Sequence, residues 1–340
     1  MSVSSDIGQE IEKLRFRNLH KRILIGTASD RYAGWLGQIY SPWSYEGQIS
    51  SRKKSVAGQS FDERTLPVRS VSEYFEHFSF LEIDYTFYQP LLDRDLQPAS
   101  SFHVLSSYAG YLKPGDGIIL KVPQAVSARR IRAGKEFIPN PDYLNPVLFT
   151  RQFYEPAGNI LGDAIKGFIF EQEYHGKNER LPPDENAVRL SEFFSAIPAD
   201  SRYHLELRTP SYLTPSCFDV LSHHGVGQVL SHWTWLPRLR DQFSKSGGRF
   251  FNSGGDVVIR LMTPLHMSYD DSYVKAYPFD RMVEGMMSTS MLDDTIDIME
   301  KALIAATRVY ITINNRAGGN APFIAQLLAD NFLKRHSRIS

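Results

Sequence analysis

Eight short runs of β-branched and aromatic residues recur along this 340-residue chain, and helical spacing of apolar residues follows each run. Gly, Pro, Asn or Ser bounds the runs, which is typical of repeated βα units. The predicted strands are 22–28, 80–87, 117–122, 167–172, 203–208, 226–231, 256–261 and 308–314. The clearest predicted helices are 71–78, 185–197, 215–223, 282–307 and 321–333. Eight such units predict an α/β fold, a single (β/α)8 TIM barrel.

A doubly wound open sheet is the rival fold. Its diagnostic turn after the first strand, G-x-G-x-x-G, is absent, because the chain reads Gly26-Thr27-Ala28 there. The length beyond an ordinary barrel of about 250 residues falls in loop-like stretches at 41–67, 128–146, 243–255 and 263–279. We therefore expect residues 1–21 to be an N-terminal extension and 22–340 one barrel domain with long βα-loop insertions. The insertion 41–67 is expected to be a mobile cover over the pocket.

Composition excludes several classes of protein. Lys plus Arg equals Asp plus Glu at 38 each, so no net charge draws the chain to nucleic acid or an anionic membrane. One cysteine, Cys217, permits neither an internal disulfide nor a C-x-x-C metal site, and the histidines show no H-E-x-x-H group. Without a signal peptide or a membrane-spanning run, we expect a cytoplasmic protein with no cofactor and no bound metal. The sequence indicates no oligomeric state.

Charged residues recur at the carboxyl ends of the predicted strands. Strand side chains alternate between two faces, so Glu82 and Asp84 share one face of the second strand, and Glu206 shares a face with Arg208 in the fifth. Other strands end in Lys121, Gln172, Arg260 and Asn314. Barrel enzymes place their chemistry at these ends, so the pattern predicts a polar pocket there.

Two interpretations of this charged set are open. In the first, Glu82, Asp84 and Glu206 are catalytic carboxylates, and neighbouring cations and amides bind the substrate. Those binding residues are Lys121, Arg208, Arg260, Asn314 and Asn315. In the second, the charges form a structural ion-pair network. The substitution Glu206→Gln distinguishes these interpretations by its effect on the free energy of unfolding. The loss should be about 1 kcal/mol or less in a solvated pocket and about 3–5 kcal/mol in a structural pair, and we expect the first result.

The last βα turn and several aromatic residues add candidate binding groups. Gly318 and Gly319 allow close backbone approach before the final helix, and Asn320 is a plausible N-cap, so the turn predicts an anion site; the alternative is an ordinary capped turn. Aromatic residues that follow strands predict stacking on a sugar or nucleobase, unless they pack under loops. They are Trp35, Tyr88 and the run His232-Trp233-Thr234-Trp235.

Several motifs together carry a family resemblance. They are 34–42 with its glycine, tryptophan and tyrosine-proline pattern, 80–88, the Glu206-x-Arg208 motif, 258–261 and 314–321. These resemble the YecE-like family, a domain of unknown function that forms a TIM barrel. Asp84 stands where that family usually has Asn, and Tyr212 where it has Trp. The family's Thr-His pair after the third strand is missing, since the chain reads Val126-Ser127-Ala128-Arg129-Arg130. The resemblance implies the barrel but no settled reaction.

The leading functional hypothesis is an enzyme, a hydrolase or lyase, that acts on a small polar or anionic molecule by carboxylate acid/base chemistry. A sugar, a nucleotide fragment or a phosphorylated metabolite fits this description. One alternative is a non-catalytic ligand- or nucleic-acid-binding barrel, with the basic runs 51–54 and 128–132 on phosphates. Another is a divalent-metal hydrolase with Glu82, Asp84 and Glu206 as ligands, against which the three nearby cations argue.

Overall fold

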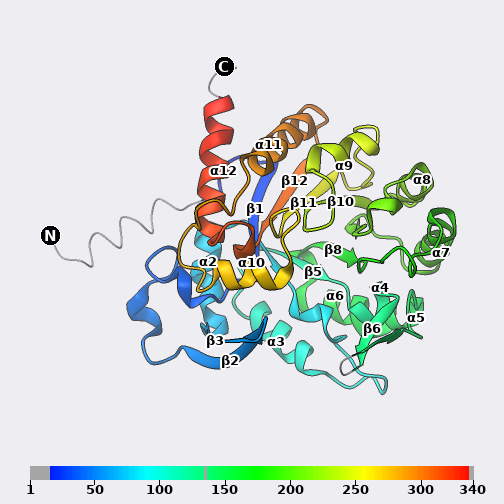
Figure 1. Cartoon of the computed structure of the whole chain (residues 1–340). Helices are drawn as coiled ribbons and strands as arrows, with labels where there is room; N and C mark the ends of the chain where they lie inside the picture. Colours follow the sequence, from blue (N-terminus) through cyan, green and yellow to red (C-terminus); the bar gives the residue numbers. More distant parts are fainter. Residues whose placement is uncertain (1–15, 134–135, 337–340) are drawn as a thin grey trace.

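The computed structural model describes residues 16–133 and 136–336 and contains a closed barrel of parallel strands (Figure 1). The strands follow one another around the barrel in chain order, and the last pairs with the first. They are β1 (Ile23–Ala28), β4 (Phe80–Ile83), β5 (Gly117–Lys121), β8 (Ile165–Glu171), β9 (Tyr203–Glu206), β10 (Gly227–His232), β11 (Asp256–Leu261) and β12 (Arg308–Ile313). All eight predicted strands are present, which confirms the (β/α)8 barrel.

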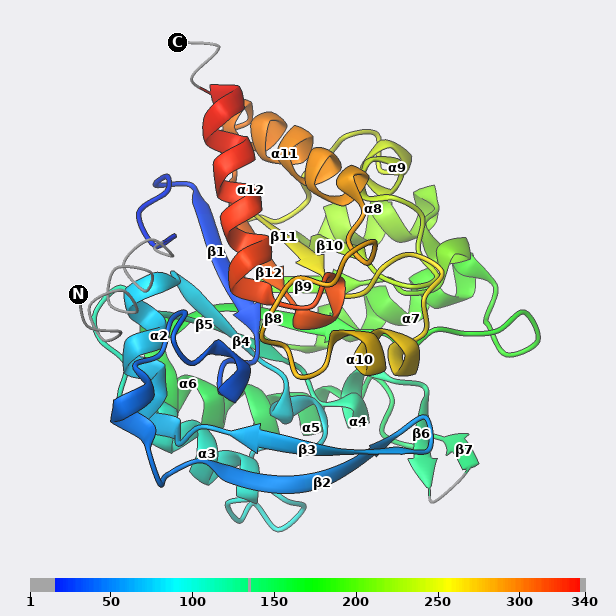
Figure 2. The same ribbon diagram turned by 60° about the vertical axis from the view of Figure 1, so that its left-hand side comes forward.

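Helices surround the strands (Figures 1 and 2). They are α2 (Val71–His77), α3 (Ser100–Ala109), α4 (Gln124–Ser127), α5 (Pro146–Phe149), α6 (Glu155–Leu161), α7 (Pro183–Ala196), α8 (Pro215–His224), α9 (Leu239–Lys245), α10 (Tyr269–Ala276), α11 (Thr289–Ile304) and α12 (Ala321–His336). Their apolar faces bury against the sheet, as Leu190 and Phe193 of α7 do at three-residue spacing. No helix within the described residues has the length and hydrophobicity that crossing a membrane requires.

Two predicted elements have different limits in the structure. The strand predicted for 80–87 ends at Ile83, because Asp84 adopts helical backbone angles (φ −101°, ψ −21°) and begins the short helix η4 (Tyr85–Phe87). Thr86 donates a hydrogen bond to the Lys121 carbonyl at 2.7 Å and so ties η4 to the end of β5. The helix predicted for 282–307 begins only at Thr289.

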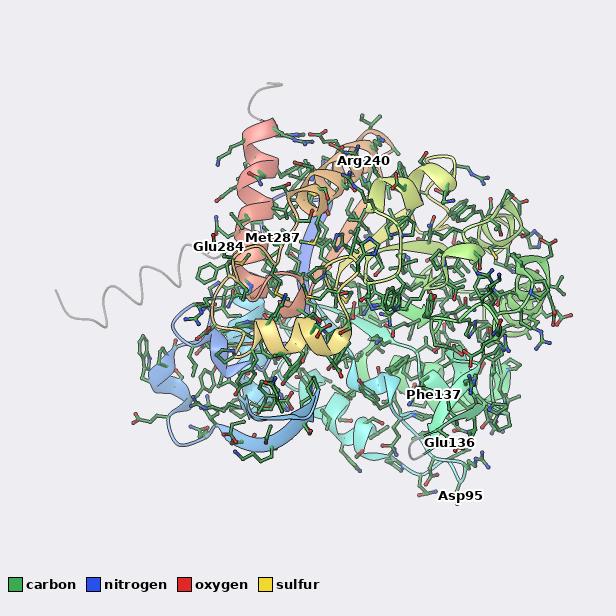
Figure 3. The ribbon with its side chains drawn as sticks, in the orientation of Figure 1. Asp95, Glu136, Phe137, Arg240, Glu284 and Met287 are labelled. Atoms are coloured by element: carbon green, nitrogen blue, oxygen red, sulfur yellow. The ribbon has the colours of Figure 1, made fainter. Side chains whose placement is uncertain are left out.

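Two antiparallel hairpins occupy the insertions after β1 and β5. The first pairs β2 (Ser50–Val56) with β3 (Gln59–Thr65), and the second pairs β6 (Arg130–Ala133) with β7 (Glu136–Pro139). Phe61 of β3 packs against the rings of Tyr273 and Tyr277 at 5.5 and 4.9 Å, so the first hairpin lies along α10 (Figure 2). The second lies at the periphery, where Figure 3 labels Glu136 and Phe137. The insertion 41–67 thus contains regular structure, and its mobility stays a prediction.

Inward-facing side chains form two layers inside the barrel. The lower layer is apolar and consists of Leu24, Phe80, Ile119, Ile169, Val229, Val258 and Tyr310. The upper layer lies two residues further along each strand and consists of Glu82, Lys121, Glu171, Glu206, Ser231, Arg260 and Thr312. The apolar layer fills the barrel beneath the charged one, so the charged layer faces the carboxyl ends of the strands.

His204 occupies the inward position below Glu206 on β9. The neighbouring strand makes room for it with Gly227, where a Cβ would lie only 2.2 Å from His204 Nδ1. Burial lowers the pKa of His204 to about 3, so the imidazole is neutral at physiological pH.

Candidate active site at the barrel mouth

One guanidinium joins three strands in the upper layer. Arg260 on β11 binds the Glu82 carboxylate of β4 through two hydrogen bonds, Nη2 to Oε1 at 2.6 Å and Nε to Oε2 at 3.0 Å. Its Nη1 donates to Glu171 Oε2 on β8 at 2.9 Å and also to Glu206 Oε2 on β9. A bidentate arginine–carboxylate pair is strong and directional. The structure therefore brings Glu82, Glu206 and Arg260 together, as strand alternation predicts.

Glu171 is the centre of this network because its carboxylate contacts three cations. Besides Arg260, it pairs with Lys121 Nζ at 2.7 Å and with Arg208 Nη1 at 2.8 Å. Burial alone would raise the pKa of Glu171, but Arg208, Lys121 and Arg260 outweigh burial and hold that pKa well below its usual range. The Glu171 carboxylate is therefore ionised throughout the physiological pH range.

Glu82 and Glu206 are completely buried, and Arg260 is 2% exposed. The expectation of a solvated pocket is wrong for these three side chains, because they pair with one another above an apolar layer instead of with water. Glu206 also lies 3.3 Å from Arg208 Nε, so it helps to hold two arginines.

The burial of Glu206 changes the result expected for Glu206→Gln. We now expect the variant to lose about 3–5 kcal/mol of unfolding free energy, because it leaves a buried guanidinium short of a counter-charge. Chemical denaturation of the variant beside the wild type measures this loss. A loss of 1 kcal/mol or less would show that water reaches the pair.

Lys121 and Arg208 are the members of the network nearest to solvent, with side chains 10% and 15% exposed. Lys121 Nζ lies 4.1 Å from the centroid of the Phe87 ring, and Arg208 Cζ lies 4.7 Å from that of Trp233. Among the described residues, Glu171 is the only ion-pair partner of Lys121, which has three N–H donors, and Glu171 and Glu206 are the only ion-pair partners of Arg208, which has five. Both cations therefore keep hydrogen-bond donors available at the mouth.

The carboxylates of this layer converge on a cation that belongs to the chain itself. Arg260 occupies the point at which Glu82, Glu171 and Glu206 meet. In the described part of the chain, no three His, Cys, Asp or Glu side chains are placed to hold a metal ion. The geometry therefore favours a guanidinium-centred site over the metal-dependent alternative.

Asp84 and Asp30 bring two further carboxyl groups to the same end of the barrel. Asp84 is partly exposed on the turn that also carries Phe87, and its carboxyl group has no hydrogen-bond or ion-pair partner among the described residues. Asp30 follows β1, which pairs with β4, and is 1% exposed. Tyr108 donates to its Oδ1 at 2.7 Å, while its buried Oδ2 has no partner in the described structure.

The environment of Asp30 favours the protonated carboxyl group. Burial raises its pKa to about 6, against the opposing hydrogen bond from Tyr108 and the charge of Arg31, and the Asp84 charge adds to the rise. Perturbed carboxyl groups gather at functional sites, so Asp30 joins the candidate set. Sequence reasoning missed this residue.

The polar groups of the last βα turn are engaged in contacts within the protein. Asn320 donates to Gln38 Oε1 and to the Phe279 carbonyl, both at 2.8 Å, and it accepts from the Phe323 amide, as an N-cap does. At Gly319, where φ is +109°, a Cβ would lie 2.4 Å from the Arg281 carbonyl. Gly318 accepts from the Val283 amide at 2.8 Å.

A covering segment, residues 279–287, makes most of these contacts, and Figure 3 labels Glu284 and Met287 on it. Asn314 accepts from the Arg316 amide at 3.0 Å. The capped-turn alternative accounts for all of these contacts, and the anion-site interpretation of this turn stays an untested prediction.

The predicted stacking residues differ in their access to solvent. Trp35 is completely buried and donates through Nε1 to Asn315 Oδ1 at 3.1 Å, and Asn315 Oδ1 also accepts from the Ala321 amide. Trp35 therefore joins the first and last βα turns and presents no face to a ligand. Tyr88 is 71% exposed beyond η4.

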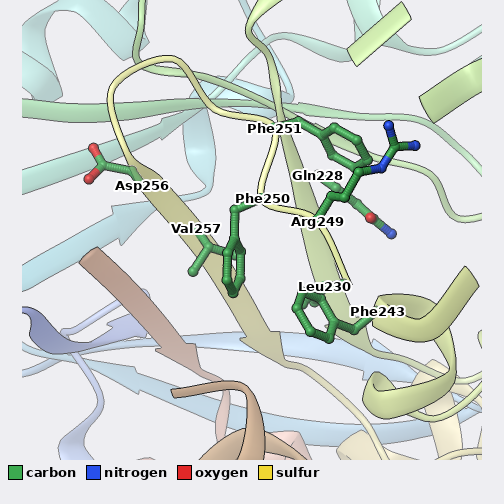
Figure 4. Close-up of a pocket in the computed structure, with 8 residues that line it drawn as sticks. All are labelled: Gln228, Leu230, Phe243, Arg249, Phe250, Phe251, Asp256 and Val257. Atoms are coloured by element: carbon green, nitrogen blue, oxygen red, sulfur yellow. The ribbon is translucent and has the colours of Figure 1, made fainter. Parts of the chain in front are cut away.

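Two cavities lie away from the charged layer. One of about 290 Å³ lies between Tyr32, the β3 strand and 277–280. The other, of about 10 Å³, lies outside the barrel beneath α9, with Leu230 and Phe243 in its wall (Figure 4). The second has room for no more than about one water molecule. Neither cavity is lined by the charged upper layer.

Comparisons with known proteins agree with this architecture. The family model described as protein of unknown function DUF72 matches residues 24–339. The chain belongs to the DUF72 family. This agrees with the YecE-like resemblance of its motifs. Among curated proteins, no match is found.

Solved DUF72 structures share the fold. A DUF72 family protein from Enterococcus faecalis V583 has a TM-score of 0.56 at 16% identity, over 92% of this chain and 95% of that one. A DUF72 family protein from Thermotoga maritima MSB8 has a TM-score of 0.52 at 16% identity, over 93% and 99% of the two chains. At such identities the likeness concerns the fold alone.

Two of the three departures from the family motifs, at Tyr212 and at the missing Thr-His pair, contact the loop after β8. Tyr212, in place of the expected Trp, accepts a hydrogen bond from the Leu181 amide at 3.0 Å. Where the Thr-His pair is missing, the amides of Arg129 and Arg130 donate to the Glu173 carboxylate, each at 2.9 Å. The loop that carries Tyr174 is therefore held from both sides.

Proposed function

We propose that the barrel mouth is the active site of an enzyme, a hydrolase or lyase, that acts on a small anionic molecule such as a phosphorylated metabolite. One observation carries the proposal: Lys121 and Arg208 flank Glu171 at the mouth with hydrogen-bond donors that no described residue uses. Phosphate and carboxylate oxygens are the strongest acceptors for such donors. Together with Arg208, the upper layer balances three carboxylates against three cations, so anion binding depends on the direction of the hydrogen-bond donors and not on excess positive charge.

The remaining residues have distinct parts in this proposal. Glu171 holds both binding cations in place, and Glu82, Glu206 and Arg260 are positioning residues, because they fix Glu171 and Arg208 without reaching solvent. Asp84 is the acid/base group, because its carboxyl group is partly exposed and unpaired among the described residues, on the turn whose Phe87 ring contacts Lys121. Proton transfer by a positioned carboxyl group typically contributes 10²–10⁴-fold to a rate.

Removal of either binding cation is expected to weaken anion binding about tenfold or more. Lys121→Gln and Arg208→Gln each delete a charge-assisted hydrogen bond, which is worth about 1.5–3 kcal/mol. Titration calorimetry with inorganic phosphate and with phosphate esters measures the change, and circular dichroism shows that each variant is folded. Arg308→Gln is the matched control, because Arg308 pairs with Asp256 at the opposite end of the barrel. Wild-type affinity in both mouth variants would contradict the proposal.

The catalytic part of the proposal has its own test. A mixture of phosphate esters is incubated with the protein and followed by ³¹P and ¹H NMR, which report hydrolysis and elimination alike. Asp84→Asn is expected to bind the converted ester as the wild type does and to lose about 10²-fold or more in turnover. A bound ester that is never converted would favour the non-catalytic ligand-binding alternative.

The nucleic-acid alternative draws less support from the geometry. In the first hairpin, Arg52 and Lys54 pair with Glu63, and Lys53 pairs with Asp62 at 2.7 Å, so all three basic residues of β2 already have ion-pair partners on β3. Arg130 pairs with Glu179. Steep salt dependence of DNA or RNA affinity would support that alternative, because it marks phosphate neutralisation.

A further inference from the structure

Three aromatic side chains form an exposed group beside Arg208, which we call the aromatic platform: Tyr174, Trp233 and Trp235. The Tyr174 ring lies 6.4 Å from the Trp233 ring and 6.1 Å from the Trp235 ring, between centroids. Tyr174 is 45% exposed and Trp235 is 49% exposed. Tyr174 follows β8 and the two tryptophans follow β10, so all three belong to loops at the carboxyl ends of barrel strands.

The platform is continuous with the proposed anion site. The Arg208 guanidinium lies over the Trp233 ring at 4.7 Å, and the same guanidinium pairs with Glu171 through Nη1 at 2.8 Å. A cation stacked on an aromatic face is held in orientation by the ring quadrupole. A molecule whose anionic group binds Arg208 therefore has aromatic surface immediately beside it.

Both loops that carry the platform are fixed by hydrogen bonds. Next to Trp235, Thr234 donates from its amide to Thr263 Oγ1 at 3.1 Å and from its hydroxyl to the Met267 carbonyl at 2.7 Å. Next to Tyr174, Glu173 accepts two backbone amides and the His175 amide donates to Thr209 at 3.0 Å. The rings are exposed although their backbones are anchored, which is the arrangement of a preformed stacking surface.

We propose that the aromatic platform binds the ring of the substrate, so that the substrate class is a phosphate ester of a ring compound, a sugar phosphate or a nucleotide. This inference rests on the proposed function, because it uses Lys121 and Arg208 for the phosphate. The chemistry shared by both classes is an anionic group joined to a ring with a flat face. Stacking of a ring on an aromatic side chain adds affinity without requiring a specific hydrogen bond.

Three probes separate the parts of the site in calorimetric titrations. Inorganic phosphate reports the anion site alone, glucose 6-phosphate adds a sugar ring, and AMP adds a nucleobase. We expect one of the two esters to bind wild-type protein at least tenfold more tightly than inorganic phosphate. The tighter ester identifies the ring: AMP indicates a nucleobase, and glucose 6-phosphate a sugar. Its binding should also change the tryptophan fluorescence.

Variants of the platform test whether these rings cause the tighter binding of the ester relative to inorganic phosphate. Trp235→Ala and Tyr174→Ala are each expected to weaken binding of the tighter ester by about fivefold or more and to leave phosphate affinity unchanged. Trp235→Phe keeps a ring face and should retain most of the affinity. Trp43→Ala is the matched control, because Trp43 is 56% exposed on η2 (Pro42–Tyr45), away from the platform, and it should bind all three probes as the wild type does.

The possible failures have different meanings. Equal affinity of wild type for all three probes, or unchanged ester affinity in both alanine variants, would overturn the platform and leave the anion site intact. Failure of all three probes to bind wild-type protein would overturn the proposed function and this inference with it.

Discussion

Replacing Arg260 by methionine is expected to lower the free energy of unfolding by about 3–5 kcal/mol or more. Arg260 makes both hydrogen bonds that the structure shows for the Glu82 carboxylate, and Glu82 and Glu206 are completely buried. Without the guanidinium, these carboxylates are left in a medium of low polarity beside one another. Urea denaturation at neutral pH measures the loss.

Arg308→Met is the control for this substitution. Arg308 forms a comparable ion pair with Asp256 at 2.6 Å, but its side chain is 46% exposed, so its loss should cost about 1 kcal/mol or less. Adding Glu82→Gln and Glu206→Gln to Arg260→Met should recover part of the stability, because it removes the uncompensated charges. Similar losses for Arg260→Met and Arg308→Met would contradict the buried-network interpretation.

Replacing Asp30 by asparagine is expected to stabilise the protein at neutral pH, by up to about 3 kcal/mol. Burial raises the pKa of Asp30 from 3.8 to about 6, so the folded protein binds this proton more tightly than the unfolded chain does. That preference favours folding below pH 4 and is lost as the pH rises through 6, at about 1.4 kcal/mol per pKa unit. Asparagine does not ionise, so the stability of the variant does not fall as the pH rises through this range.

The pH dependence of the Asp30→Asn effect is the decisive measurement. The gain should appear at pH 7.5 and disappear at pH 4, where the wild-type carboxyl group is protonated. Asp95→Asn, at an exposed aspartate, should change stability by no more than about 0.5 kcal/mol at either pH. A gain that is equal at both pH values would show that charge is not its cause.

The barrel and most of its charged layer follow from local sequence patterns. Runs of β-branched residues mark the strands, and the period of two places Glu82, Lys121, Glu206 and Arg260 on inward faces at the carboxyl ends. The limits of the second strand could not be predicted in this way, because the alternation continues through Asp84 although the backbone turns helical there.

Glu171, the centre of the charged network, was missed because sequence reasoning takes the neighbouring residue as the polar end of the fourth strand. The predicted fourth strand ends at Gln172, and Glu171 is not among the candidate site residues that the sequence predicts. In the structure, Glu171 follows Ile169 on the inward face, and Gln172 donates outside the barrel to Tyr143 at 3.2 Å. A shift of one residue exchanges the two faces of a strand. The alternation of Gly167, Ile169 and Glu171 was the available signal.

The burial of the site and the role of Asp30 depend on contacts between distant parts of the chain. Asp30 looks like an ordinary loop aspartate, and it is buried because Tyr40 donates to its carbonyl and Tyr108 to its carboxyl group. Likewise, the buried Glu82 carboxylate accepts its hydrogen bonds from Arg260, which lies 178 positions away in the sequence. Local patterns carry no information about such partners.

The apolar layer beneath the charges closes the barrel interior toward the amino ends of the strands. Phe80, Ile169 and Val258 belong to the packed layer that blocks passage toward the amino ends of the strands. Under the proposed function, a ligand would therefore reach and leave the site only from the carboxyl ends of the strands, where Lys121 and Arg208 flank Glu171. In the proposed reaction, substrate and product would therefore compete for the same opening, and product would have to leave before the next substrate binds.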